Sequence, residues 1–153
     1  MRVLVQEVLR ASVKIEGQEV GKIERGFLLF VGFTEGDDEK TILKMADKVC
    51  KLRIFPDENG KTNKSIFDIG GNILSVSQFT LYASAKEGNR PSFVKAMVPA
   101  EATLLFDKWN ALLRERFPNL QTGVFGADMK VELINDGPFT LWLDSEELFG
   151  DKR

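Results

Sequence analysis

Histidine is absent from this 153-residue chain, and cysteine occurs once, at position 50. The lack of imidazole excludes Ser-His-Asp and Cys-His catalytic groups, histidine general bases and nearly all zinc sites. A single cysteine cannot form a disulfide framework within the chain, and a domain of about 150 residues builds a hydrophobic core without one. Any catalysis must therefore work without histidine, and we expect no metal and no cofactor.

Long apolar runs and an excess of positive charge are also missing. No apolar run reaches the roughly 18 residues of a membrane-spanning helix, and the first residues lack the apolar core of a signal peptide. Lys and Arg number 21 against 23 Asp and Glu, a net charge of −2. This balance argues against a basic coat for DNA but permits contact with RNA through a local basic patch. We expect a cytoplasmic protein with neither a DNA nor a membrane partner.

The apolar pattern predicts one α+β domain over residues 1–153. Apolar residues recur at helical spacing over 37–53 and 99–117, and Cys50 lies beside the first apolar stripe as an expected core residue. The predicted strands cover 2–9, 12–16, 20–24, 26–33, 73–81, 124–134 and 139–143. We expect a mostly antiparallel sheet or open barrel with two packed amphipathic helices, and a charged, frayed tail at 145–153.

Three segments place polar or small residues where a plain core would not. Strand alternation over 75–81 puts Ser77 and Phe79 on one face, and Gln78 and Thr80 on the other. A solvent-facing strand explains this pattern; the functional alternative is a strand at a cleft, with N–H groups and hydroxyls facing an ester carbonyl. Turn chemistry predicts a hairpin connection at 135–138, and Phe125 in segment 123–129 reads as a core aromatic on pattern alone.

Four ordered motifs resemble the D-aminoacyl-tRNA deacylase family, also called D-tyrosyl-tRNA deacylase. They are SQFTL at 77–81, GNRPSF at 88–93, TGVFGADM at 122–129 and NDGPFT at 135–140, preceded by VQ-V--AS at 5–12 and LRIF at 52–55. The resemblance implies a layered α/β/β fold and hydrolysis of the ester that joins a D-amino acid to tRNA. It also implies chiral proofreading by rejection of L-amino acids, in a homodimer with active sites at the subunit interface. A pocket of that kind should also accept glycyl-tRNA.

The resemblance assigns roles to individual residues. It implies that the Gly137–Pro138 peptide is cis and reaches into the partner's pocket, where its carbonyls hold the substrate's α-amino group. Phe125 matches the aromatic that stacks on the terminal adenine. The pocket residues around the scissile carbonyl are Ser77, Gln78, Phe79 and Thr80, and Met129 joins the substrate-binding set. One departure is Glu7, because the family usually has an arginine there that supports the Gly-Pro motif.

Two chemical readings of Thr80 remain. As a covalent nucleophile its hydroxyl would need an adjacent base, and the motif supplies none. We therefore expect the backbone N–H groups of Phe79 and Thr80 to bind the oxyanion while the tRNA 2′-OH assists a water molecule. The alternatives are a Thr80-nucleophile esterase and a dimeric module that binds RNA ends without turnover.

Contact with tRNA must use local positive charge. Lys86, Arg90 and Lys95 surround the loop after SQFTL and are the expected tRNA-binding residues. A second candidate region contains Lys48, Lys51, Arg53, Lys61 and Lys64. For each of these side chains the alternative is an ordinary solvated surface charge.

Overall fold

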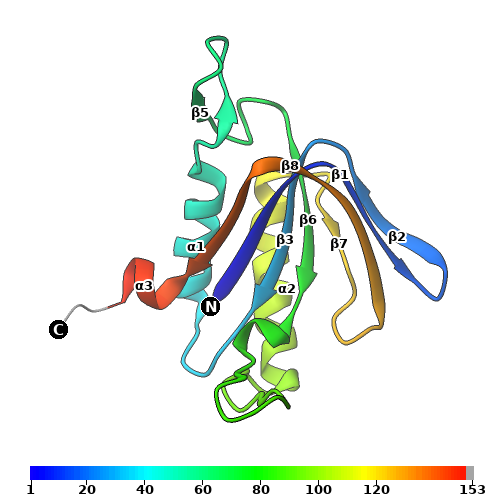
Figure 1. Ribbon diagram of the computed structural model, residues 1–153, viewed down its shortest axis with the longest axis vertical. Helices are drawn as coiled ribbons and strands as arrows, with labels where there is room; N and C mark the ends of the chain where they lie inside the picture. The colour runs from blue at the N-terminus through cyan, green and yellow to red at the C-terminus, as the bar shows by residue number, and fades with distance from the viewer. Residues whose placement is uncertain (151–153) are drawn as a thin grey trace.

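The computed structural model describes residues 1–150, which form a curved sheet with two long helices packed against one face (Figure 1). The sheet contains β1 (Arg2–Ile15), β2 (Gln18–Ile23), β3 (Gly26–Gly32), β6 (Asn72–Ser77), β7 (Gln121–Thr122) and β8 (Met129–Asp144). A separate hairpin contains β4 (Phe55–Pro56) and β5 (Thr62–Lys64). The helices are α1 (Glu39–Lys51), α2 (Pro99–Arg116), α3 (Ser145–Phe149) and the 3₁₀ helix η1 (Phe79–Tyr82).

The strand order is β2-β1-β3-β6-β7, with β8 on the other edge of β1. β1 runs antiparallel to β2, β3 and β8, whereas β3–β6 and β6–β7 are parallel pairs. β2 also approaches β6 and β7, so the sheet curves toward a barrel. The predicted α+β class with a mostly antiparallel sheet and packed helices is confirmed. Among residues 1–150, no helix is long and apolar enough to cross a membrane.

The two predicted helices are present as α1 and α2, and their ends differ from prediction by at most two residues. The strand predictions need correction in two places. The segments 2–9 and 12–16 form one strand, because β1 continues through irregular pairing with β8 near Val8. The segments 124–134 and 139–143 likewise join in β8, which begins only at Met129.

The expected fraying of 145–153 does not apply to its first five residues. They form α3, and the buried Ser145 hydroxyl accepts a hydrogen bond of 2.8 Å from the Met1 ammonium. Asp144 caps this helix by accepting a hydrogen bond from the Glu146 N–H at 2.9 Å. Residues 151–153 lie outside the described part of the chain.

The main core lies between the sheet and the two long helices. It includes the fully buried Trp109 of α2 and the predicted core residue Cys50 of α1. Burial raises the pKa of the Cys50 thiol, which keeps it protonated and unreactive. The Trp109 indole N–H donates to the Ser75 hydroxyl of β6 at 3.2 Å, so this bond joins α2 to the strand that leads to SQFTL.

Substitution of Ser75 by alanine should destabilise the fold. Both Ser75 and Trp109 are fully buried, so the indole N–H would lose its partner without access to water. We expect a loss of about 1–3 kcal/mol in the free energy of unfolding, measured by urea denaturation. Ser12→Ala, at a partly exposed serine on the outer face of β1, is the control. Equal stabilities of the two variants would contradict this role of the buried bond.

Candidate active site

A cavity of about 730 Å³ opens where β6 ends, between the chain after η1 and the loop that leads into β8. These segments lie at the lower end of the view in Figure 1. The lining is mostly apolar, which suits a small-molecule site with few polar contacts. It consists of Val76, Ser77, Gln78, Phe79, Phe93, Val94, Ala96, Met97, Val98, Pro99, Phe125, Gly126, Ala127, Asp128, Met129 and Val131.

The chain turns out of the sheet at Gln78 because β3 holds its backbone. The Gln78 N–H donates to the Val31 carbonyl at 2.7 Å. A Cβ atom on Gly32 would lie only 2.9 Å from the Gln78 carbonyl oxygen, so this close approach requires glycine. The predicted strand 73–81 therefore ends at Ser77, and the predicted alternation of faces over 77–80 is wrong beyond that residue.

Two neighbouring backbone donors face no acceptor at this turn. Gln78 and Leu81 donate their N–H groups to the carbonyls of Val31 and Gln78. Phe79 and Thr80 begin η1, and within residues 1–150 their N–H groups have no hydrogen-bond acceptor. The first N–H groups of any helix lack partners inside the helix, so this geometry follows from where η1 starts. Phe79 lines the cavity and Thr80 follows it directly in the chain, so this pair of donors lies at the edge of the cavity.

The Thr80 hydroxyl lies beside the cavity-lining residues without being one of them. It accepts a hydrogen bond of 2.5 Å from the Gln78 side-chain amide. An amide N–H is a donor and cannot remove a proton from the hydroxyl. In the described chain the Thr80 hydroxyl therefore has no hydrogen-bonded base, and its partner does not activate it as a nucleophile.

Aromatic rings form two walls of the cavity. Phe79 meets Phe93 edge to face, with ring centroids 5.2 Å apart. Phe125 packs against Phe106 of α2, with centroids 6.2 Å apart. The structure thus brings Ser77, Gln78, Phe79, Phe125 and Met129 together around one cavity, whereas Thr80 is not among the lining residues.

The sequence did not single out residues 93–99 as a wall of the cavity, apart from placing Phe93 in the GNRPSF motif. A usable signal was the apolar pair Phe93-Val94 at the end of a polar loop. The Val94 side chain is 87% exposed and the Val98 side chain 58% exposed. Large exposed apolar side chains at the rim of a cavity indicate a surface that another molecule covers.

Gly137 and Pro138 lie away from this cavity. They are exposed and are not among its lining residues, and in Figure 1 the middle of β8 crosses the upper edge of the sheet, above the cavity segments. The Gly137–Pro138 peptide is cis, as the family resemblance implied. A Cβ atom on Gly137 would meet nothing within 4 Å.

The predicted hairpin connection at 135–138 is wrong, because β8 pairs with β1 on both sides of it. Gln6 pairs with Thr140 and Val8 pairs with Asn135, so two steps along β1 match five along β8. The three surplus residues make segment 136–139 leave the sheet as a bulge, and we call this segment the excursion. The Thr140 hydroxyl contacts the side chains of both Gln6 and Asn135, which closes the base of this excursion.

Glu7 is a buried carboxyl group opposite the excursion. The residue is 3% exposed and follows Val3 and Val5 on the core side of β1. Burial, together with the nearby charge of Asp136, raises the pKa of Glu7 to about 7, although Arg25 acts in the opposite sense. This carboxyl group is therefore largely neutral below neutral pH.

The raised pKa of Glu7 predicts a pH-dependent stability. Between its ordinary pKa of 4.5 and about 7, the unfolded chain loses this proton while the folded chain keeps it, so stability falls as pH rises. Glu7→Gln cannot ionise, and its free energy of unfolding should gain about 3 kcal/mol relative to wild type across that interval. Urea denaturation from acid to neutral pH measures the difference. Glu132 is exposed, so Glu132→Gln should show no such gain. Parallel curves of unfolding free energy against pH for Glu7→Gln and wild type would contradict the raised pKa of Glu7.

The predicted tRNA-binding residues Lys86, Arg90 and Lys95 are exposed on the segment between η1 and α2. Within residues 1–150 none of the three forms an ion pair, and their neighbours in the chain, Phe93 and Val94, line the cavity. Within residues 1–150, no group of three or more Cys, Asp or Glu side chains is arranged to hold a metal ion.

Comparison with known proteins assigns the class. The family model for D-Tyr-tRNA(Tyr) deacylase matches residues 4–144. A D-aminoacyl-tRNA deacylase of Lactobacillus delbrueckii subsp. bulgaricus is 58% identical over 144 residues, covering 94% of this chain and 99% of the relative. One from Bacillus velezensis is 51% identical over 147 residues, covering 96% of this chain and all of the relative.

Solved structures agree with this fold. A protein named c-Myc DNA Unwinding Element Binding Protein is 39% identical, with a TM-score of 0.89 over 94% of this chain and 98% of that one. A probable eukaryotic D-amino acid tRNA deacylase is 15% identical, with a TM-score of 0.81 over 93% of this chain and 97% of that one. At this identity the second likeness concerns the fold alone.

These matches define an enzyme class, the hydrolases that act on ester bonds. Within that class, the chain belongs to the D-aminoacyl-tRNA deacylase family.

Proposed function

We propose that this enzyme proofreads chirality: it hydrolyses D-aminoacyl-tRNA to tRNA and a free D-amino acid, and it rejects L-aminoacyl-tRNA. The observation that carries the proposal is the pair of unpartnered N–H groups of Phe79 and Thr80 at an apolar cavity. Paired backbone donors of this kind suit the oxyanion that forms when an ester is attacked. The proposed substrate places the enzyme in the cytoplasm, where tRNA is charged.

The proposed reaction needs no side-chain nucleophile. The ester carbonyl lies against the N–H groups of Phe79 and Thr80, and water, assisted by the 2′-OH of the terminal ribose, attacks the carbonyl carbon. The negative charge of the tetrahedral intermediate is held by the two N–H groups. The bond to the 3′-oxygen then breaks, this oxygen takes a proton, and the amino acid leaves as its carboxylic acid. Phe125 stacks on the terminal adenine, with Met129 beside it.

We infer that the active site is completed by a second copy of the chain. The excursion that carries Gly137 and Pro138 is exposed and remote from the cavity of its own chain. Apolar side chains at the cavity rim, including Val94 and Val98, offer a surface for that copy to cover. In this arrangement the Gly137 and Pro138 carbonyls hold the substrate's α-amino group, and an L side chain collides with the excursion. Glycine has no side chain to reject, so glycyl-tRNA is also a substrate.

The test is single-turnover deacylation of D-Tyr-tRNA, L-Tyr-tRNA and Gly-tRNA, with spontaneous hydrolysis subtracted. We expect rapid release of D-tyrosine and glycine and no enzyme-dependent release of L-tyrosine. Equal rates for D- and L-Tyr-tRNA would remove chiral rejection, and intact Gly-tRNA would remove the glycine proposal. A trapped acyl-enzyme with esters that lack tRNA would instead favour Thr80 as a nucleophile.

Replacement of Lys86, Arg90 and Lys95 by alanine should weaken tRNA binding without altering chirality. These cations lie on the segment between η1 and α2, which also carries lining residues of the cavity, and they have no competing ion pairs in the described chain. Each phosphate contact contributes about 0.7–0.9 to the slope of log affinity against log salt concentration. We expect the triple variant to raise the tRNA KM and to flatten this slope by about 2. An unchanged slope would remove the three residues from the tRNA contact.

A further inference from the structure

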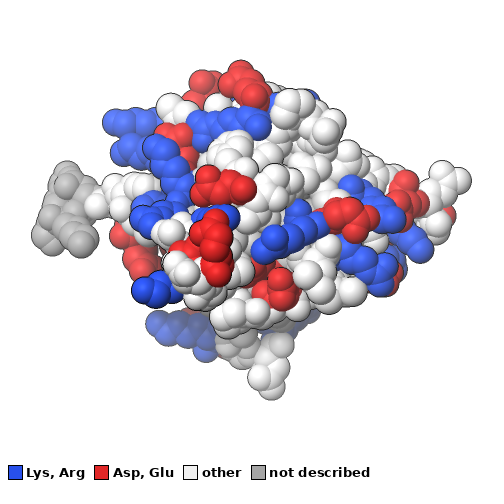
Figure 2. All heavy atoms as spheres, turned by 90° about the horizontal axis from the view of Figure 1, so that it is seen from above, with Lys and Arg blue, Asp and Glu red and all other residues white. Residues whose placement is uncertain are grey.

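A second cationic surface lies on α1, on residues that the proposed reaction does not use. Four exposed cations, Lys44, Lys48, Lys51 and Arg53, line a hollow of about 550 Å³; we call them the α1 cationic face. Seen from above, Lys and Arg side chains are exposed on the side of the molecule where α1 lies, with Asp and Glu side chains among them (Figure 2). This concentration of positive charge occurs in a chain whose net charge is −2.

Helix electrostatics do not account for the whole face. Lys48 and Lys51 lie in the last turn of α1, where they compensate the helix dipole. Lys44 lies before that turn, and Arg53 lies beyond the end of the helix. Lys44, Lys48 and Lys51 are spaced at i, i+4 and i+7, which places them in one row about 10 Å long. Such a row covers about three nucleotides of one duplex strand.

The positive charges of the face are not neutralised within the described chain. Among residues 1–150, no carboxylate lies within 4.0 Å of the four cationic groups. Of the acidic residues that the structure describes, Asp47 alone lines the hollow, and Arg116 already pairs with its carboxylate at 2.6 Å. By contrast, Lys64 of the predicted second region pairs with Glu58 at 2.8 Å and does not line the hollow.

Two of the cations are held in place before any ligand binds. The Lys44 ammonium lies over the ring of Phe149 in α3, 5.8 Å from its centroid. The Arg53 Nε donates to the Asn63 backbone carbonyl at 3.0 Å, and a second guanidinium nitrogen contacts the Asn63 side chain. Fixed side chains lose less conformational entropy on binding, so the hollow is suited to a ligand that carries a row of anionic groups.

We propose that the α1 cationic face binds phosphate groups in the body of the tRNA while the aminoacylated 3′ end occupies the cavity. This inference rests on the proposed function, which supplies a polyanion large enough to contact both surfaces. The face shares no residue with the cavity, so it contributes affinity for tRNA and takes no part in the chemistry or in chiral selection.

The test compares full-length D-Tyr-tRNA with a D-tyrosyl ester of a short single-stranded oligonucleotide ending in CCA. We measure kcat/KM against salt concentration for wild type and for the variant Lys44→Ala/Lys48→Ala/Lys51→Ala. With full-length tRNA, the variant should lose at least about tenfold in kcat/KM at low salt, and its salt slope should become shallower by about 2. With the short substrate the two proteins should be equal.

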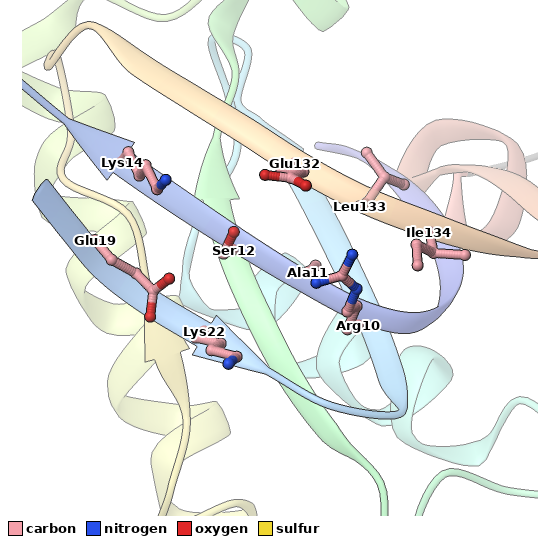
Figure 3. A pocket seen from close by; sticks show the side chains of 9 residues that line it. All are labelled: Arg10, Ala11, Ser12, Lys14, Glu19, Lys22, Glu132, Leu133 and Ile134. Carbon is pink, nitrogen blue, oxygen red and sulfur yellow. The ribbon is translucent and has the colours of Figure 1, made fainter. Parts of the chain in front are cut away.

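The control is Lys14→Ala/Lys22→Ala, which removes two cations from the outer face of β1 and β2. A hollow of about 200 Å³ on that face is lined by Glu19 and Glu132 as well as by these lysines (Figure 3). We expect wild-type kinetics on both substrates, because the nearby carboxylates offset the positive charge. An equal loss in control and α1 variant would mean a general charge effect and would overturn the proposal.

Failure of the inference and failure of the proposed function give different results. If wild type releases D-tyrosine from both substrates and the α1 variant keeps the wild-type salt slope, the tRNA contact is overturned. The α1 variant could also keep wild-type kinetics with tRNA and lose the ability to sediment with phosphatidylserine vesicles. That result would assign the face to a membrane surface and would also overturn the proposed tRNA contact. If wild type releases no D-tyrosine even from the short substrate, the proposed function itself fails.

Discussion

Replacement of Gly137 by valine should abolish deacylation of D-Tyr-tRNA while leaving the fold of the chain intact. A Cβ atom at this position meets nothing within 4 Å in its own chain, so the added side chain finds open space there. In the proposed dimer, substrate bound in the partner's cavity occupies this space, and the new side chain collides with the substrate's α-amino group. We expect a single-turnover rate at least about a hundredfold below wild type, a loss of at least about 2.7 kcal/mol in transition-state stabilisation.

The unfolding temperature and the dimer fraction of Gly137→Val should match those of wild type. If activity and folding are lost together, the residue has a structural role in its own chain and the argument fails.

Complementation between two inactive variants tests whether the site is shared. Ala127→Trp places a large ring at a cavity-lining position, and its excursion is unchanged. A heterodimer of Gly137→Val and Ala127→Trp contains one site with an intact cavity and an intact excursion. Random exchange of subunits should therefore restore about a quarter of the wild-type activity, because half of the dimers are mixed and each has one working site. No recovery after verified exchange would place the whole site within one chain.

Phe79→Pro should slow the chemical step by about a hundredfold to a thousandfold relative to Phe79→Ala, the range for removing one oxyanion donor. Both variants lack the aromatic ring, and only proline also lacks the N–H. Phe79 is the first residue of η1, a position that tolerates proline, and Gln78 before it, with φ −148° and ψ 87°, lies outside the α region that a following proline disfavours. The comparison therefore isolates the donor that the proposed mechanism uses.

Thr80→Ala completes this test, because it removes the hydroxyl and keeps the N–H. We expect single-turnover rates within about threefold of wild type, less than about 1 kcal/mol. Loss of all activity in a folded Thr80→Ala protein would transfer the chemistry to the hydroxyl. Equal rates for Phe79→Pro and Phe79→Ala would remove the Phe79 N–H from the oxyanion site.

Local periodicity predicted the elements whose structure depends on nearby residues. The stripe that contains Ile42, Met45 and Val49 defined α1, and the same reasoning defined α2. Periodicity failed at Gln78, because the chain turns there through contacts with Val31 and Gly32, far away in the sequence. The strand prediction thus extended to residue 81, and the N–H groups of Phe79 and Thr80 were expected as oxyanion donors because the motif supplies no base for Thr80, not because a 3₁₀ helix was foreseen.

The same limit applies to the remaining parts of the site. Turn chemistry at 135–138 predicted a reversal of the chain, whereas the long β1 strand pairs with β8 on both sides and turns that segment into an excursion. Residues 93–99 were missed as a cavity wall, because hydrogen bonds with Phe33 and Thr34, far away in the sequence, hold this segment in place. Lys44 was likewise absent from the predicted basic regions, since the contact with Phe149 joins two distant elements.

The free N–H groups at the start of η1 have a consequence for inheritance. In the proposed reaction the donors are backbone N–H groups, and every amino acid except proline carries one. Single-nucleotide changes at positions 79 and 80 can alter how well a substrate fits, yet almost none of them deletes a donor. A saturation-mutagenesis library should therefore contain many working codons at both positions.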